Sequence, residues 1–416
     1  MMRTIVVSFL QFFFLIYLFF YMFPYPLIEL PLMGELLIYY DEGTALLSIW
    51  SGENLLGLDK VERSPMNGSG DTTFDYIKFF TSLIFTLLAT CIAFSIPAFR
   101  KNQKKFSNFI HIYARYFLAI FLFNYGLAKF YEGQFLFPDF SRLDQKIGDS
   151  SPMGLLWTFM GYSKAYTFFS GLCEIAGAVL LLFRRTSVLG ALVSFLVMLN
   201  VVMLNFAYDV PVKLFSTHLA LISVFIFSPN FKNLFRFFFQ NETVGLKSEP
   251  IELHNRWLKS GRIIIKFGCL FGFPAWFLYL GLSYRKAEAN HHLNGSYITE
   301  VFVKNNDTLT PAENDSTAWK KFFITGAYSK IIFQNEKKKF FVTEIDSTMQ
   351  SIRFTSFPDS AETWKLEYRF EDRKKFVLSG LFRSDRITAT FNVTKPEDYE
   401  LLRRKFNWIN EQPYNR

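Results

Sequence analysis

The sequence predicts a multi-pass α-helical membrane protein with about seven transmembrane helices, followed by a C-terminal all-β domain that folds as an antiparallel barrel or sandwich. Half of the 416 residues are apolar, including 53 Phe and 20 Tyr. Several apolar windows reach the ~18 residues that span a ~30 Å hydrocarbon core. After about residue 290 these windows stop, and apolar and polar residues alternate, which is typical of half-buried strands.

Apolar segments predict seven membrane-spanning helices in order along the chain: residues 4–22, 76–99, 109–128, 166–183, 188–208, 212–227 and 263–282. The first segment follows Arg3 and continues into an aromatic stretch without a small-residue cleavage site. A secretory signal would have a shorter apolar core and such a site, so we expect an uncleaved helix.

Charges between the spans alternate in sign, which predicts the topology. Lys and Arg cluster after the second, fourth and sixth spans, whereas the loop 28–75 is rich in Asp and Glu. By the positive-inside rule, the N-terminus is cytoplasmic and the C-terminal domain lies on the extracytoplasmic side of the membrane. This topology also explains the net charge of +9, so we expect the lipid bilayer as a partner and no nucleic acid.

Five regions follow from these patterns. They are an N-terminal two-helix membrane region (1–106) with an extracytoplasmic loop (28–75), a four-helix transmembrane core (107–229), a basic cytoplasmic linker (230–262), a seventh transmembrane helix (263–283) and an extracytoplasmic β domain with a C-terminal helix (290–416). In the last region we expect about eight short strands between Ser296 and Val393, then a helix over 396–404.

The four-helix core carries polar side chains at positions expected to lie within the membrane. Such groups are costly in hydrocarbon, so they usually face the interior of a bundle and have a function. Five form a candidate intramembrane site: Arg115, Asn124, Glu174, Asn200 and His218. Four more form a polar layer nearer the outer face: Lys129, Asn205, Asp209 and Lys213.

Depth along the helices predicts which of these groups meet. At ~1.5 Å per residue, Arg115 lies ~12 Å from the basic end of its helix and Glu174 lies ~13 Å from the same face. We therefore expect the two to pair or to share a polar cavity, the alternative being that Arg115 reaches toward the headgroups while Glu174 is neutral. His218 is suited to proton exchange or ligand binding, although an interhelical hydrogen bond is the ordinary role of a lone His. In the outer turn, Asp209 and Lys213 are expected to form a local salt bridge.

Metal and nucleotide sites are not expected. All three cysteines stand alone in apolar helices, and the carboxylates nearest His218 are predicted at other depths. Residues 67–73 are rich in Gly but lack the Gly-Lys-Ser/Thr ending of a phosphate-binding loop. A capping box is the better interpretation, with Thr72 at the start of the second helix and Asp75 three residues on.

Three motifs in the core resemble the DoxX-like family of bacterial membrane proteins. They are Tyr-Ala-Arg-Tyr at 113–116, Tyr-Gly-Leu-Ala-Lys at 125–129 and Ser-Gly-Leu-Cys-Glu-Ile-Ala-Gly at 170–177. The resemblance covers roughly residues 109–227 and implies a four-helix bundle with an Arg and a Gly-x-x-Glu helix, Gly171 to Glu174 here. The chain resembles a larger subtype with added N-terminal helices and a C-terminal β domain. Relatives are associated with thiol or quinone redox systems, and the lack of cysteine pairs argues against a thiol role.

Three functions are compatible with these features. We favour a redox-associated membrane subunit without autonomous catalysis, in which Glu174, Arg115 and His218 exchange protons while Asn124 or Asn200 binds a ring carbonyl of a quinone. A small-molecule transporter would use the same polar interior, but the sequence lacks the internal repeat that many transporters show. A scaffold would instead display the β domain to an envelope protein partner.

Overall fold

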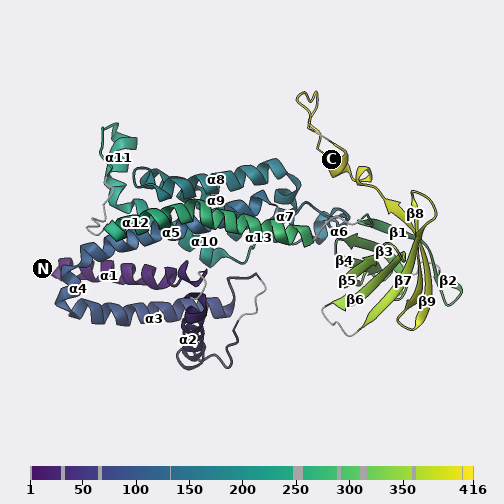
Figure 1. The fold of residues 1–416 in the computed structure, drawn as a ribbon, viewed down its shortest axis with the longest axis horizontal. Coiled ribbons are helices and arrows are strands. Elements are labelled where there is room, and N and C mark those ends of the chain that lie inside the picture. Colours follow the sequence, from purple (N-terminus) through teal and green to yellow (C-terminus); the bar gives the residue numbers. More distant parts are fainter. Residues whose placement is uncertain are drawn as a thin grey trace. The chain divides into compact units, whose positions relative to one another are not determined.

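The computed structural model describes residues 2–29, 33–63, 68–131, 133–246, 256–287, 292–309, 316–357, 362–404 and 406–415 (Figure 1). The chain divides into two compact units. One, the helical unit, comprises Met1–Leu136 and Ser151–Leu282. The other, the β unit, comprises Phe137–Ser150 and Ser283–Arg416.

The helical unit contains, among its described residues, seven helices long and apolar enough to cross a membrane. They are α1 (Met2–Met22), α3 (Thr73–Ser95), α5 (Gln103–Phe130), α8 (Lys164–Leu182), α9 (Ser187–Ala207), α10 (Lys213–Phe227) and a last helix made of α12 (Arg256–Phe267), the π-helical turn η4 (Gly268–Gly272) and α13 (Phe273–Ala287). The predicted order of the spans is confirmed, and the chain is a multi-pass membrane protein.

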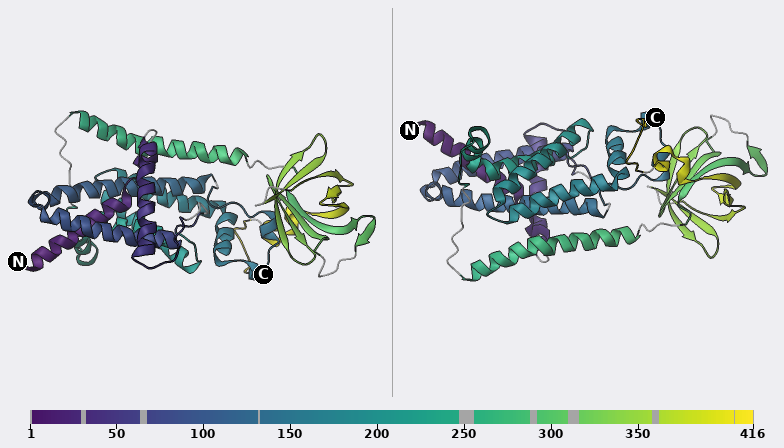
Figure 2. Two further views of the ribbon diagram at one scale, coloured as in Figure 1. Left: turned by 90° about the horizontal axis from the view of Figure 1, so that it is seen from below. Right: turned by 90° about the horizontal axis from the view of Figure 1, so that it is seen from above.

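An additional long helix, α2 (Met33–Asn54), lies where the sequence analysis predicted a loop. Its acidic residues keep its hydropathy below that of a span, so the transmembrane pattern missed it. Small residues form its buried face, and a Cβ on Gly52 would lie 2.7 Å from the side chain of Val61 and 3.1 Å from that of Ile77 in α3. Figures 1 and 2 show α2 lying steeply across α3.

Shorter helices connect the long ones: η1 (Leu27–Glu29), α4 (Pro97–Lys101), α7 (Pro152–Tyr162), η3 (Ser228–Asn230) and α11 (Phe231–Gln240). The capping box predicted for the start of α3 is confirmed. The Asp75 amide donates to Thr72 Oγ1 at 3.2 Å, and the Thr72 amide donates to Asp75 Oδ2 at 3.0 Å. This reciprocal pair satisfies two amide groups that the first turn of the helix leaves unbonded.

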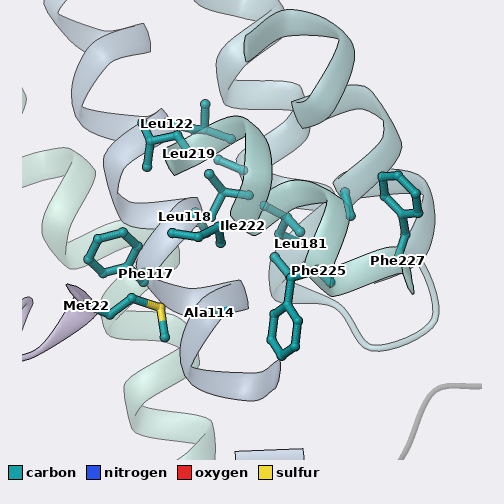
Figure 3. Close-up of a cluster of buried hydrophobic side chains, with 14 of the residues drawn as sticks. Met22, Ala114, Phe117, Leu118, Leu122, Leu181, Leu219, Ile222, Phe225 and Phe227 are labelled. Atoms are coloured by element: carbon teal, nitrogen blue, oxygen red, sulfur yellow. The ribbon is translucent and has the colours of Figure 1, made fainter. Parts of the chain in front are cut away.

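Helix α5 lies at the centre of the helical unit. Its buried residues Ala114 and Leu118 belong to one apolar cluster with Leu181 of α8 and Ile222 of α10 (Figure 3). Helices α5 and α8 approach each other closely at a pair of glycines. A Cβ on Gly126 would lie 2.8 Å from a backbone oxygen of the α8 glycine opposite, so only small residues permit this packing.

The β unit is built on nine strands in the part of the chain that the structure describes: β1 (Gly295–Lys304), β2 (Asp307–Leu309), β3 (Trp319–Thr325), β4 (Tyr328–Phe333), β5 (Lys338–Asp346), β6 (Ser351–Phe357), β7 (Thr363–Phe370), β8 (Lys375–Phe382) and β9 (Asp385–Thr394). Strands β3 to β9 follow one another in antiparallel order, and β1 pairs with both β3 and β9. The eight strands thus close into a barrel, while β2 only extends the end of β1 (Figure 2).

Large side chains fill the barrel interior. Along β7, Leu366 and Tyr368 are buried while Lys365 and Glu367 are exposed, as the alternating sequence predicted. The largest of the fully buried side chains in the barrel are aromatic: Tyr297, Trp319, Phe322, Phe341, Phe354, Phe376 and Phe391. An eight-stranded barrel is just wide enough to be filled in this way, so its interior is a core. The predicted helix over 396–404 is instead a 3₁₀ turn, η5 (Pro396–Asp398), followed by the short α14 (Glu400–Arg403).

Residues 137–150 belong to the β unit, although the sequence analysis assigned them to the four-helix core. They contain α6 (Phe140–Leu143) and η2 (Ile147–Asp149). Asp144 forms a 2.6 Å ion pair with Lys321 of β3, and Lys330 of β4 donates to Ser141 at 2.8 Å. The connection between α5 and α7 is therefore packed on the barrel wall.

Candidate functional site

A buried ion pair joins α5 to α8. Lys129 Nζ lies 2.9 Å from Glu174 Oε1 and 2.8 Å from Oε2, and the two side chains are 5% and 3% exposed. The ammonium also donates to the carbonyl oxygen of Tyr125 at 3.4 Å and lies 5.8 Å from the ring centre of Phe135. Charges buried this deeply are tolerated when each compensates the other.

The glycine pair between α5 and α8 allows this ion pair to form. A Cβ on Gly171 would lie 2.6 Å from the carbonyl oxygen of Gly126 and 3.1 Å from Lys129 Cβ. Glu174 lies three residues after Gly171, on nearly the same helix face. A larger side chain at either glycine would separate the helices and lengthen the contact between the two charges.

The expected pairing of Arg115 with Glu174 is wrong. Arg115 Nε and Nη2 donate to the carbonyl oxygen of Leu181 at 3.1 and 2.8 Å. That carbonyl lies in the last turn of α8, where the helix itself supplies no donor, so Arg115 caps the end of α8. The expected pairing rested on depths counted from predicted helix ends, and these gave the wrong register between α5 and α8. Helix α5 begins earlier than predicted, at Gln103, and it contacts α8 near Gly171, about one turn from Glu174.

His218 of α10 connects to α1. Its Nε2 lies 2.6 Å from the hydroxyl oxygen of Tyr17, and its Nδ1 lies 2.7 Å from the carbonyl oxygen of Leu214. Because a carbonyl only accepts, we assign the proton to Nδ1, and Nε2 then accepts the hydrogen bond from Tyr17. The ring of Tyr21 stacks on the imidazole with the centroids 4.1 Å apart. His218 therefore forms an interhelical hydrogen bond, the ordinary role weighed for it.

The three asparagines of the prediction have different environments. Asn205 is buried and its Nδ2 donates to Ser216 Oγ of α10 at 2.9 Å. Asn124 is half-buried on α5. Asn200 is exposed, so the prediction that it faces the interior is wrong. The buried face of α9 includes Ser194 and Asn205, and a helix places Asn200 well away from that face.

The outer polar layer contains a contact that the sequence analysis missed. The predicted salt bridge is confirmed, with Lys213 Nζ 2.8 Å from Asp209 Oδ1. In addition, the Asp71 carboxylate accepts from the amides of Lys213 at 2.7 Å and Leu214 at 2.9 Å. Asp71 thus caps the start of α10 from a loop more than a hundred residues earlier in the chain, for which no local sequence signal exists.

A cavity of about 790 Å³ lies in the helical unit beside these polar contacts, within the range of ~300–1,000 Å³ usual for small-molecule sites. The end of α1, parts of α2, α3 and α5, the start of α10 and residues 68–70 line it. We call it the aromatic cavity because of the rings on its wall: Phe20, Tyr21, Phe23, Tyr25, Tyr40, Phe79, Phe85, Phe117, Phe121, Tyr125 and Phe215.

Two residues that line the aromatic cavity, Thr81 and Tyr25, have buried hydroxyl groups with no hydrogen-bond partner among the described residues. Thr81 is only 4% exposed. A buried polar atom without a partner costs free energy unless something else supplies the bond. Each of the two hydroxyl groups therefore has the capacity for one further hydrogen bond.

The aromatic cavity borders the polar residues identified above. Tyr21 lines the cavity and stacks on His218, and Tyr125 lines it while its carbonyl oxygen accepts from Lys129. Of the predicted site residues, Lys129 and His218 thus each contact a residue of the cavity wall, and Glu174 pairs with Lys129, although none of the three lines the cavity itself. Arg115 lines a different cavity.

Comparison with known proteins gives one informative match. YwoB of Bacillus subtilis (strain 168), described as an uncharacterized protein, is 39% identical over 127 residues, which are 29% of this chain and 79% of YwoB. No family model matches the sequence. No solved structure matches it either. Because the match covers most of YwoB at this identity, the chain belongs to the same protein family as YwoB.

Proposed function

We propose that the protein is a redox-associated membrane subunit that binds a lipid-soluble quinone in the aromatic cavity. The observation that carries this proposal is the presence of two unpaired buried hydroxyl groups, those of Thr81 and Tyr25, in residues of a cavity wall that is rich in aromatic rings. A quinone ring stacks on such side chains, and its two carbonyl oxygens accept hydrogen bonds from hydroxyl groups.

The residues around the cavity support a role in proton transfer. Reduction of a quinone to the quinol takes up two electrons and two protons. Tyr21 of α1 and His218 of α10 form a stacked pair beside the cavity, and Tyr17 donates to that same imidazole. In this proposal the electrons come from a membrane redox partner, and the chain itself contributes binding and proton positions without autonomous catalysis.

The resemblance to the DoxX-like family supports the same function, since its relatives are associated with quinone redox systems. We also propose a bacterial inner membrane location with the basic helix ends in the cytoplasm, on the basis of the positive-inside rule. The filled barrel interior supports a role for the β unit through its outer surface, for example in contacting an envelope protein.

The test is binding of a soluble short-chain quinone to the full chain in a mild detergent, measured by quenching of Trp and Tyr fluorescence. Thr81→Val removes the hydroxyl at nearly constant volume and should weaken binding about fivefold, the usual effect of one hydrogen bond. Tyr25→Phe should act similarly.

Thr86→Val is the matched control. Thr86 lies on the same helix, is fully buried and also has a hydroxyl without a partner in the described part of the chain, but it is not on the cavity wall. Binding that is equally weakened by the Thr81 and Thr86 substitutions, or that is absent from the unmodified protein, would refute the proposal.

A further inference from the structure

A second cavity, of about 710 Å³, lies where α4 joins α5 in the helical unit. Its wall also includes part of α1, the start of α9 and the end of α10 with η3. Four cationic side chains line it, those of Arg100, Lys101, Lys104 and Arg115, and its described lining contains no carboxylate. We call it the basic cavity.

Nothing among the described residues neutralises these cations. None of the ion pairs in that part of the chain involves Arg100, Lys101 or Lys104. Arg115 donates through Nε and Nη2 to Leu181, which leaves Nη1 for another acceptor. Four positive charges around one cavity favour a bound anion, and the planar guanidinium suits a phosphate group in particular.

Another part of the wall is apolar. Phe14 and Leu15 come from α1, Ile112 from α5, and Phe225 and Ile226 from α10. An inorganic anion gains nothing from contact with an apolar surface, whereas the acyl chains of a lipid would bury it. The cavity therefore combines a site for a charged group with a site for a hydrocarbon chain.

Helix α11, which follows η3 of the cavity wall, is amphipathic. Phe235 and Phe238 lie on one side of α11 and are exposed, whereas Lys232 and Arg236 lie on the other. This division of side chains is typical of short helices that lie in the membrane interface, at the depth of lipid headgroups. Helix α11 begins at the residue after η3, part of the cavity wall, and Figure 1 shows it at the end of the helical unit where α4 lies.

We propose that the basic cavity binds an anionic phospholipid, with the phosphate held by Arg100, Lys104 and Arg115 and the acyl chains against the apolar wall. This site is independent of the quinone proposal. It takes a different class of ligand and shares no lining residue with the aromatic cavity.

The test is titration of the full chain in a neutral detergent with phosphatidylglycerol, phosphatidylcholine or inorganic phosphate, followed by native mass spectrometry and thermal unfolding. Phosphatidylglycerol should bind and raise the melting temperature more than phosphatidylcholine. Lys104→Gln should weaken phosphatidylglycerol binding about fivefold, the contribution of one cation near an anionic lipid. Because Lys104 is exposed, this variant should fold normally.

Lys105→Gln is the matched control. It removes the same charge from an exposed neighbouring residue that does not line the cavity. Equal weakening by both substitutions would show general attraction to the basic surface and overturn the proposal. Inorganic phosphate that displaces the lipid at equal concentration would also overturn it, because the apolar wall would then contribute nothing.

Discussion

Removing one member of the Lys129–Glu174 ion pair should destabilise the protein more than removing both. Glu174→Leu leaves the Lys129 ammonium, with a side chain only 5% exposed, beside no carboxylate. Such an uncompensated buried charge costs about 3–5 kcal/mol. Lys129→Met leaves the Glu174 carboxylate without its partner, and the Glu174 side chain is only 3% exposed, so the same loss of stability is expected.

The double variant Lys129→Met/Glu174→Leu removes both charges and fills the space with apolar groups. Its loss of stability should be smaller than that of either single variant, so the coupling free energy between the two sites should exceed about 3 kcal/mol. The assay is reversible unfolding of the full chain in mixed micelles, with the free energy of unfolding obtained for all four proteins.

An exposed pair supplies the control. The side chains of Lys60 and Glu62 are 76% and 73% exposed, so Glu62→Gln should change the free energy of unfolding by less than ~0.5 kcal/mol. If the effects of the Lys129 and Glu174 substitutions simply add, the two charges do not compensate each other, and the account of the α5–α8 contact given above is wrong.

Two further predictions concern the packing of α5 and the pH response of the barrel. Gly171→Ala should lower the free energy of unfolding by at least about 2 kcal/mol, because the added Cβ would lie 2.6 Å from the backbone oxygen of Gly126. Gly43→Ala in α2 is the control: its Cβ would have nothing within 4 Å, so this variant should be neutral or slightly stabilising in the same assay. In the barrel, hydrogen bonds from Lys304 and Asn305 hold the pKa of Asp385 below its usual range. Its contribution to stability is therefore fully present above the ordinary carboxyl pKa and is lost as the pH falls through the lower pKa of the folded state. Thermal melts of the β signal of the full chain against pH should show this loss on acidification, and Asp385→Asn should reduce the slope; an unchanged slope would contradict the assignment.

Much of this fold could be predicted because its signals are local. A transmembrane helix is recognised by its own length and hydropathy. The alternation of apolar and polar residues around Leu366 likewise indicates which side chains of that strand are buried. The capping box of Thr72 and Asp75 and the salt bridge between Asp209 and Lys213 each involve residues three or four positions apart. These predictions needed no knowledge of how distant elements pack.

The predictions that failed depended on register or on contacts between distant segments. Whether Glu174 meets Arg115 or Lys129 is decided by where two helices cross, and that point is set by a glycine pair whose partners cannot be recognised from either helix alone. Asn200 shows a different limit, because one asparagine in an apolar helix does not identify the buried face. The aromatic cavity could not be foreseen because five separate helices line it, one of which, α2, the hydropathy pattern did not reveal.

The contacts of α5 suggest which part of the helical unit is fixed and which can respond to a ligand. Arg115 and Lys129 tie α5 to α8 at two points about 20 Å apart along the helix, and Gly126 packs against α8 between them. Sliding of α8 along α5 would break a capping bond, an ion pair and a close backbone contact together.

The other walls of the aromatic cavity come from α1, α2, α3 and the start of α10. Among these, the packing face of α2 consists of small residues that bury little apolar surface. We therefore expect a ligand to be admitted by movement of α2 against a fixed α5–α8 pair. Hydrogen exchange should accordingly be faster in α2 than in α5, and a bound quinone should slow it mainly in α2.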